Sequence, residues 1–378
     1  MKIGILTQHL HNNYGGLLQA FALQRYLSNQ DHDVLTIDFT SDNIGATVNK
    51  KSRAGEVKNI IYYYIRKYIL RRNIKSIFPV SDEVKASIGK ETRRFVAENI
   101  RTTQKLKSIE QLKYLDSYKF DAYVVGSDQV WRPRYSPGLP AFFLDFLKDD
   151  KKTKRLSYAA SFGTDNCDEY SPTELTKFSN LLKKFNGISV REDSAVELCN
   201  KHFDVSVEQV LDPTMLLAKE DYIELVEKDK IAESDGNMMV YVLDQSVEKV
   251  EMIDKVAKAK NLTPFTVMPS DETGIYPPVT KWLRGFMDAE YIVTDSFHGV
   301  AFSILFNKQF IAIGNKSRGI ARFTSILKKF GLESRLLINK SDLRESILDE
   351  TIDYSLVNEL LAKEQSYAFN FLKKNLSN

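Results

Sequence analysis

Cysteine is scarce in this 378-residue sequence, which contains only Cys167 and Cys199. The two are isolated, so they argue against a structural disulfide and favour a reducing compartment. We therefore expect a cytoplasmic protein.

Long apolar runs are missing as well. The N-terminus, MKIGILTQHLHNNYGG, has one lysine followed by only four apolar residues, which is not the pattern of a secretory signal peptide. No stretch approaches the ~18 uninterrupted apolar residues that a membrane-spanning helix needs. We expect no transmembrane segment.

A strong charge of either sign is also absent. Lys and Arg number 53 against 50 Asp and Glu, and the net charge of +3 is too small to indicate a nucleic-acid partner. No zinc-ligand spacing occurs, so no metal site is expected. With 43% hydrophobic and 27% charged residues, the chain can bury full cores, and its length fits two domains of roughly 150 to 200 residues.

Short apolar, β-branched runs recur along the chain, with amphipathic helical segments between them. Strands that are apolar on both faces and alternate with helices indicate parallel sheets covered on both sides. We predict an α/β fold with two Rossmann-like domains that face a cleft. The ten predicted strands lie at 2–6, 34–39, 122–127, 156–162, 187–191, 207–211, 238–243, 265–268, 291–295 and 310–314.

The predicted boundary between the domains is Leu211-Asp212-Pro213, where a strand end is followed by a proline and the β/α pattern then starts again. Ligand sites in such domains lie at the carboxyl ends of the strands, so the cleft is the expected pocket. The predicted parts are an N-terminal domain over 1–215, a C-terminal domain over 216–345, and a C-terminal helix over 346–378 that can pack back on the first domain.

A helical insertion over about 50–100 interrupts the first domain. Its segment 50–75, KKSRAGEVKNIIYYYIRKYILRRNIK, has nine Lys or Arg against the single Glu56, with apolar residues at helical spacing. Such a helix can lie on an anionic membrane surface, here the inner face, or hold a lipid-linked acceptor. Alternatively, it packs its apolar stripe on its own domain.

A glycine-bearing loop follows the first predicted strand. Gly15 and Gly16, at the start of a helix, leave backbone N–H groups open to an anion, and Asn13 is a side-chain donor in the same loop. The loop is not GxGxxG, so a nicotinamide fingerprint is absent. The glycines can also serve only to turn the chain. We read His9 and His11 as bystanders.

A second polar group follows the strand at 122–127, in GSDQVWRP. Ser127, Asp128 and Gln129, backed by Trp131, suit the hydroxyls and the apolar face of a sugar. Alternatively, Asp128 caps the next turn.

An arginine ends the strand at 187–191. Arg191 is expected to aim its guanidinium into the cleft, where a phosphate or carboxylate would bind in a bidentate manner. The alternative is a surface pair with Glu192 or Asp193.

The stretch YIVTDSFHGVAFSILF puts His298 between a buried strand and a buried helix, with Asp295 or Ser296 as cap. A helix N-terminus opposes the imidazolium by ~0.3 to 1 kcal/mol. A bound phosphate would instead raise the pKa of the histidine and favour a protonated general acid. Gly299 would let a ligand approach the backbone closely. The alternative is a structural histidine with a hydrogen-bond partner.

Two further arginines follow the strand at 310–314. Arg318 and Arg322 have i,i+4 spacing and share one helix face, so either could be a second anion clamp in the cleft, or pair on the surface.

Together these motifs resemble the polysaccharide pyruvyl transferase family over about residues 1–335. The matching stretches are NYGGLLQAFAL, VGSDQVW, YAASFG, ISVRE, VLDPTMLL, DSFHGVAF and the RF, SIL and FGL of RFTSILKKFGL.

The resemblance implies a GT-B-like fold with no metal or other cofactor. The implied reaction transfers a pyruvyl group from phosphoenolpyruvate to two hydroxyls of a sugar as a cyclic ketal, in capsule or exopolysaccharide assembly. It also implies that His298 is catalytic and that Arg191 binds the donor. Several family branches have an arginine where this chain has Ser296, which gives Arg318 or Arg322 more weight as the phosphate ligand.

The chemistry of the residues agrees with this resemblance. Phosphoenolpyruvate carries two anionic groups, which the arginines and the glycine loop can bind, and His298 can protonate its methylene while Asp128 orients a hydroxyl. Two rival functions stay open: a GT-B glycosyltransferase using a nucleotide-activated sugar, and a non-catalytic glycan-binding protein.

Overall fold

The computed structural model describes residues 1–41, 82–269, 273–314 and 319–377. The basic segment 50–75 and Arg318 lie outside the described residues, so the structure does not test the predictions made for them.

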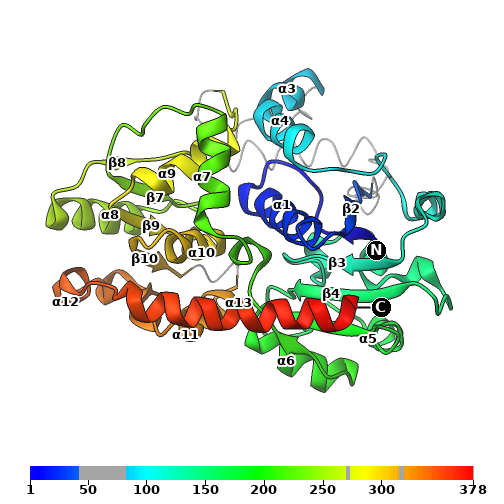
Figure 1. The fold of residues 1–378 in the computed structure, drawn as a ribbon. Coiled ribbons are helices and arrows are strands. Elements are labelled where there is room, and N and C mark those ends of the chain that lie inside the picture. Colours follow the sequence, from blue (N-terminus) through cyan, green and yellow to red (C-terminus); the bar gives the residue numbers. More distant parts are fainter. Residues whose placement is uncertain (42–81, 270–272, 315–318, 378) are drawn as a thin grey trace, which may run out of the picture.

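Two parallel sheets form the framework of the molecule (Figure 1). All ten predicted strands overlap an observed one, and the structure adds β11. The first sheet has the order β2-β1-β3-β4-β5-β6 and the second β11-β10-β9-β7-β8, which confirms two Rossmann-like domains. The strands are β1 (Lys2–Leu6), β2 (Asp33–Thr36), β3 (Ala122–Val125), β4 (Lys154–Ala160), β5 (Gly187–Val190), β6 (Glu208–Gln209), β7 (Met238–Tyr241), β8 (Pro264–Phe265), β9 (Tyr291–Thr294), β10 (Gln309–Ile313) and β11 (Leu336–Leu337).

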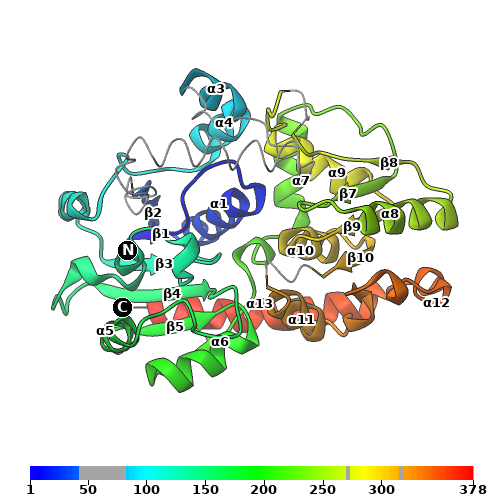
Figure 2. The ribbon, with the colours of Figure 1, turned by 180° about the vertical axis from the view of Figure 1, so that it is seen from behind.

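Helices cover the sheets and connect their strands. The C-terminal helix α13 runs along both domains and ends beside the first, as both ribbon views show (Figures 1 and 2). Its Phe371 and Leu372 are buried in one cluster with Ile3 and Val124. The described helices are α1 (Tyr14–Ser28), α3 (Asp82–Ile88), α4 (Lys90–Asn99), α5 (Pro172–Leu182), α6 (Asp193–Leu198), α7 (Lys219–Lys228), α8 (Val247–Lys260), α9 (Val279–Asp288), α10 (Phe297–Leu305), α11 (Ala321–Lys329), α12 (Glu345–Asp349) and α13 (Tyr354–Leu376).

Each sheet reverses its strand order once, and a ligand crevice forms at such a reversal beyond the carboxyl ends of the strands. The reversal lies between β1 and β3 in the first sheet and between β7 and β9 in the second. The loops that leave these four strands therefore carry the side chains that can meet a ligand.

The two domains share a hydrophobic core below the crevice. Helix α10 is buried on every side, as expected for a helix without a polar face, and its Phe297 and Val300 belong to one buried cluster with Leu17 and Phe21 of α1. Because burial of these side chains is the main favourable term in folding, this shared core fixes α1 and α10 relative to each other.

Helix α4 adds a polar connection between the domains. Arg94 donates two hydrogen bonds, of 2.7 and 2.8 Å, to the carboxylate of Asp229, which follows α7. On the same helix, the Thr92 hydroxyl donates to Asn12 Oδ1 at 2.7 Å. The insertion therefore contacts both the second domain and the loop after β1.

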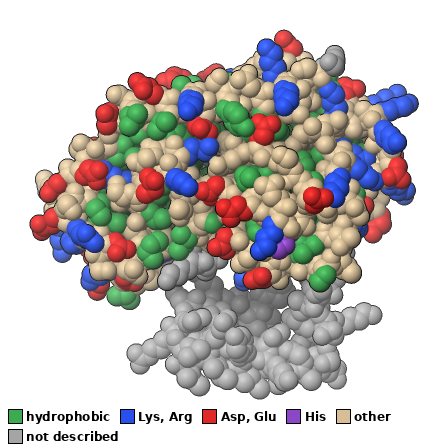
Figure 3. Space-filling model, turned by 90° about the horizontal axis from the view of Figure 1, so that it is seen from below, with side chains coloured by type: hydrophobic (Ala, Val, Ile, Leu, Met, Phe, Trp, Pro, Cys, Tyr) green, Lys and Arg blue, Asp and Glu red, His purple; other side chains and the backbone are tan. Residues whose placement is uncertain are grey.

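The described helices and the face drawn in Figure 3 show neither a membrane-spanning segment nor a dominant charge. None of the helices in the described part is long and apolar enough to cross a bilayer. On the face seen in Figure 3, acidic and basic side chains are interspersed. This agrees with the small net charge of the sequence.

Candidate active site

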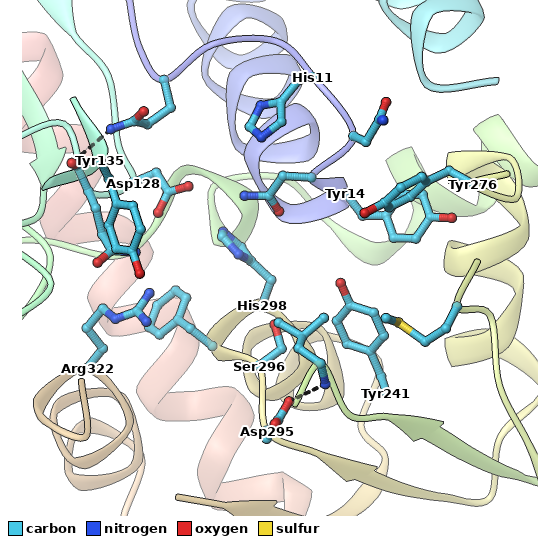
Figure 4. Close-up of a pocket in the computed structure, with 17 residues that line it drawn as sticks. His11, Tyr14, Asp128, Tyr135, Tyr241, Tyr276, Asp295, Ser296, His298 and Arg322 are labelled. Atoms are coloured by element: carbon cyan, nitrogen blue, oxygen red, sulfur yellow. Dashed lines mark hydrogen bonds between the residues drawn. The ribbon is translucent and has the colours of Figure 1, made fainter. Parts of the chain in front are cut away.

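A cavity of about 460 Å³ lies between the domains, where the two crevices face each other (Figure 4). The first domain contributes residues after β1 and β3. The second contributes residues at the ends of β7 and β9, between β8 and α9, and on α10 and α11. The lining residues are Gln8, His11, Asn12, Asn13, Tyr14, Asp128, Gln129, Tyr135, Tyr241, Leu243, Met268, Tyr276, Asp295, Ser296, Phe297, His298 and Arg322.

His298 occupies the middle of this cavity, in the first turn of α10 (Figure 4). Its imidazole lies against the backbone of Gly15, so close that a Cβ at residue 15 would overlap the ring, with Nδ1 nearest. The N-termini of α1 and α10 therefore meet at the imidazole. Unpaired N–H groups and the helix dipoles make such a meeting point suitable for an anion.

Asp212 lies behind His298 and is a site residue that sequence reasoning missed. Its Oδ2 is 3.7 Å from His298 Nε2 and 2.8 Å from Arg191 Nη1, and its side chain is fully buried. Its Oδ1 accepts hydrogen bonds from the backbone N–H and the hydroxyl of Thr214. The sequence signal was present in VLDPTMLL, but we used Asp212 only to mark a domain boundary.

Arg191 does not reach the cavity, which corrects the prediction that it opens into the cleft. Its side chain is 2% exposed, pairs with Asp212, and lies 3.6 Å from Asp128 and 3.8 Å from Glu192. Its guanidinium stacks 4.2 Å from the centre of the Phe297 ring. The alternative was a surface pair with Glu192 or Asp193; the contact with Glu192 exists, but it is buried rather than on the surface.

The pKa values of this group follow from its burial and its charges. Burial alone would raise the pKa of Asp212, but His298 and Arg191 outweigh it and hold that pKa well below its usual range. Burial would lower the pKa of Arg191, but Asp212, Asp128 and Glu192 together raise it. Asp212 and Arg191 therefore stay ionised, as a buried pair behind the histidine.

Arg322 does line the cavity, at the end where Asp128 lies (Figure 4). It is 7% exposed. Burial lowers its pKa to about 10, with nearby Arg191 acting in the same direction. It therefore remains a cation at neutral pH, at a position where an anionic ligand can reach it.

Asp128 and Gln129 line the cavity from the loop after β3. The backbone of Asp128 is left-handed, with φ of 67°, a conformation that aspartate tolerates better than most residues. The carboxylate lies beside both arginines and acts electrostatically on each of them.

Ser127 and Trp131 were predicted to touch the acceptor, and the structure corrects both. Ser127 is fully buried, and its hydroxyl contacts the Ala159 carbonyl and Asp212. Trp131 is also fully buried, stacks on Phe143 at 5.5 Å and donates its indole N–H to the Phe142 carbonyl. Neither side chain can meet a ligand in the cavity.

Of the predicted site residues near the N-termini of α1 and α10, some line the cavity and others pack inside the protein. Asn13 and Ser296 are the N-cap residues of α1 and α10, make no side-chain cap hydrogen bond, and line the cavity. Gly16 lies next to Asn13 in the first turn of α1. Gly299 was predicted to admit a ligand, but a Cβ there would overlap the side chain of Thr294, so its role is internal packing.

The two N-terminal histidines differ in their position. His9 lies outside the cavity lining and contacts the Thr40 hydroxyl, and burial lowers its pKa to about 4. His11, which we read as a bystander, lines the cavity. No group of three or more His, Cys, Asp or Glu side chains in the described ranges is arranged to hold a metal ion.

Comparison with solved structures shows the fold. Over its full length the chain matches MnaA of S. aureus in complex with UDP, at 12% identity and a TM-score of 0.51, covering 97% of that chain. It likewise matches the UDP-N-acetylglucosamine 2-epimerase of Rickettsia bellii at 10% identity and 0.50, covering 99% of that chain. The corresponding epimerase of Neisseria meningitidis gives 9% identity and 0.50, with 99% of this chain and 100% of that one covered. These likenesses confirm the GT-B-like arrangement.

No curated protein matches the chain at the sequence level. The model of the polysaccharide pyruvyl transferase family, in contrast, matches residues 13–317. This range includes Asn13, Asp212 and His298, and it covers the strands from β2 to β10. The chain therefore belongs to the polysaccharide pyruvyl transferase family.

Proposed function

We propose that the protein transfers a pyruvyl group from phosphoenolpyruvate to two hydroxyls of one sugar, forming a cyclic ketal and releasing phosphate. Membership of the family supports a transferase that acts on polysaccharide. The observation that carries the finer proposal is the placement of His298 between two helix N-termini and in front of Asp212. The proposal involves no cofactor.

The donor would bind at the end of the cavity that holds Arg322 and the two helix starts. Phosphoenolpyruvate has a phosphate and a carboxylate, and a guanidinium and free backbone N–H groups are suitable partners for both. Arg191 contributes indirectly, because it fixes Asp212, while Arg322 takes the direct role first assigned to Arg191. Asn13 and Ser296 line the cavity at the two helix starts, with Gly15 and Gly16 in the first turn of α1 behind them.

His298 would act as the acid that starts the reaction. Its imidazolium gives a proton to the methylene carbon of the donor, which becomes a methyl group and leaves an oxocarbenium-like centre at C2. The oxygen of one sugar hydroxyl bonds to C2, and its proton returns to His298. The second hydroxyl oxygen then bonds to C2 as the C2–O bond to phosphate breaks, and its proton leaves with the phosphate.

Asp212 would act as a positioning residue in this scheme. Nε2 of His298 is buried and faces Asp212, while Nδ1 lies on the side of Gly15. A carboxylate behind the imidazole favours the tautomer with the proton on Nε2. Nδ1 is then the nitrogen that exchanges protons with the substrates.

Calorimetric titration tests the donor assignment. Wild-type protein, Arg322→Gln and the control Lys328→Gln are titrated with phosphoenolpyruvate, UDP and GDP. Lys328 is on the same helix as Arg322, but its side chain is 70% exposed. We expect phosphoenolpyruvate alone to bind, more weakly to Arg322→Gln. Binding of a nucleotide without phosphoenolpyruvate would favour a nucleotide-sugar glycosyltransferase instead.

We also propose that the acceptor belongs to a surface polysaccharide, such as a capsule or exopolysaccharide, or to its lipid-linked precursor, and that the protein works in the cytoplasm. The basic segment 50–75 would contact the inner membrane face, and it lies outside the described residues. Sedimentation with anionic and neutral vesicles tests this contact. Equal recovery of the protein with both kinds of vesicle would contradict it.

A further inference from the structure

The cavity extends away from Arg322 on the other side of His298, and this second end is aromatic. Figure 4 shows Tyr14, Tyr241 and Tyr276 grouped there, with His298 between them and Arg322. Leu243 and Met268 line the same cavity. The histidine therefore separates the end with Arg322, which also holds Asp128 and Tyr135 and is here called the cationic end, from the end with three tyrosines, here called the aromatic end.

The rings at the aromatic end are held in fixed positions. The Tyr14 hydroxyl donates to the Pro277 carbonyl at 2.8 Å, and the Tyr276 ring meets the Tyr14 ring edge-on at 5.8 Å. Tyr241 meets the fully buried Trp282 edge-on at 5.2 Å. Burial raises the pKa of Tyr14, and the neighbouring Tyr241 and Tyr276 add to the effect, so the phenol stays neutral.

This end offers a ligand both apolar surface and polar partners. Tyr14 and Tyr241 are buried, while Leu243, Met268 and Tyr276 are half-buried and leave part of their surface open. The amide of Asn12 also lines the cavity and accepts a hydrogen bond from Thr92 of α4. It lies beside Gly89, whose neighbour Ile88 accepts a hydrogen bond from the backbone N–H of Tyr276. Apolar surface with a few placed polar groups is typical of a site for a neutral small molecule.

We propose that the aromatic end binds the pyranose ring of the acceptor, which rests on the proposed function. The C–H face of the ring would lie against Tyr276 and Tyr241, since tyrosine combines a large apolar face with a polar hydroxyl. The sugar hydroxyls would contact Asn12 and the phenols. A sugar in this position presents two hydroxyls to His298, on the side opposite the donor.

This assignment replaces the acceptor contacts that were predicted from sequence. Ser127 and Trp131 are buried behind the first domain's loops, and Gln129 is at the cationic end with Asp128. The aromatic end belongs mainly to the second domain, in loops around Tyr241 and Tyr276. The two substrates would then enter from different ends and meet at the imidazole.

Saturation-transfer NMR with methyl pyranosides tests the proposal. The ligands are both anomers of the methyl glycosides of glucose, galactose, mannose and N-acetylglucosamine. Each is added to wild-type protein, Tyr276→Ala, Tyr276→Phe and Tyr114→Ala. Phosphoenolpyruvate is present at a saturating concentration in every sample. The methyl group is small, so the sugar ring itself must make the contact. Tyr114 is the control, because it is 48% exposed and lies outside the cavity lining.

We expect wild-type protein to bind at least one pyranoside, and Tyr276→Ala to weaken that binding by about tenfold or more. Tyr276→Phe keeps the ring and should stay within about threefold of wild type, as should Tyr114→Ala. The affinity for phosphoenolpyruvate should change by less than about twofold in all three variants, because the donor binds at the other end.

Three results would overturn the proposal. The first is that wild-type protein binds none of the pyranosides. The second is that wild type and Tyr276→Ala bind them equally. The third is that UDP competes with the pyranosides in a way that depends on Tyr276, which would make the aromatic end a nucleobase site. Failure of the donor assignment gives a different result: phosphoenolpyruvate does not bind, while pyranoside binding still depends on Tyr276.

Discussion

The carboxylate of Asp212 lies directly behind the imidazole of His298, with Oδ2 3.7 Å from Nε2. The same oxygen is 2.8 Å from Nη1 of Arg191. One buried carboxylate thus links a histidine of the second domain to an arginine of the first. Since both partners approach the same oxygen, the histidine, the arginine and the interface between the domains are expected to respond together to a change at Asp212.

Replacement of Asp212 by asparagine should destabilise the protein. The exchange leaves Arg191 as a buried charge without its closest partner, which typically costs about 3 to 5 kcal/mol of unfolding free energy. Urea unfolding measures this loss. Asp204→Asn is the control, because Asp204 makes an exposed pair with Lys183, and no measurable change is expected there. Equal stability of wild type and Asp212→Asn would contradict the buried-pair interpretation.

The contribution of Asp212 should depend on pH in one direction. Its pKa in the folded protein lies below that of an exposed aspartate, ~3.9. Its stabilising effect is therefore fully present above about pH 4 and is lost as the pH falls further, toward the folded-state pKa. Urea midpoints of wild type and Asp212→Asn, measured from pH 7 downward, should converge only below about pH 4. Convergence near neutral pH would argue against an ionised Asp212.

Gly15→Ala should displace the imidazole of His298 while leaving the fold intact. A Cβ at residue 15 would overlap the ring, and the ring must move because the helix backbone cannot. A shift of about 1 Å at a catalytic group can reduce the rate by ~10²-fold. The direct measurement is the imidazole chemical shift of His298 in NMR, compared with Ser28→Ala in the last turn of the same helix. An unchanged His298 signal in Gly15→Ala would show that the contact is not tight.

Arg322→Gln should weaken phosphoenolpyruvate binding by about 10- to 100-fold, the usual range for one hydrogen-bonded charge. Because burial brings the pKa of Arg322 only to about 10, the residue stays charged between pH 6 and pH 8. The ratio of wild-type to variant affinity should therefore be the same at both pH values. A ratio that changes several-fold over this range, or an equal effect of Lys328→Gln, would point to another phosphate ligand.

Trp131→Ala should reduce stability without affecting sugar binding. The indole is fully buried, so its removal leaves a large cavity and is expected to cost about 3 to 5 kcal/mol. The same substitution at the exposed Tyr114 should cost far less. Thermal unfolding measures the first effect and pyranoside titration the second. Loss of sugar affinity in a folded Trp131→Ala protein would restore the acceptor role first predicted for it.

Local patterns in the sequence were sufficient to predict the two parallel sheets. Within the described residues, runs that are apolar on both faces predicted every strand except β11. Strand-then-helix patterns also located the loops that carry Asn13, Asp128 and His298, and in parallel sheets such loops gather at one edge. Each of these features depends on neighbours a few residues apart, which is why sequence alone could give them.

Which residues each side chain contacts, in contrast, was decided only by the tertiary structure. The sequence ends a strand at Arg191, but whether a ligand or a carboxylate balances its charge depends on Asp212, 21 residues later in the chain. Trp131 follows a strand like a cleft residue, yet the rings of Phe143 and Phe162 enclose it. Gly15 and His298 meet only because two domains share a core. Burial and pairing arise from contacts between distant segments, and no local pattern records them.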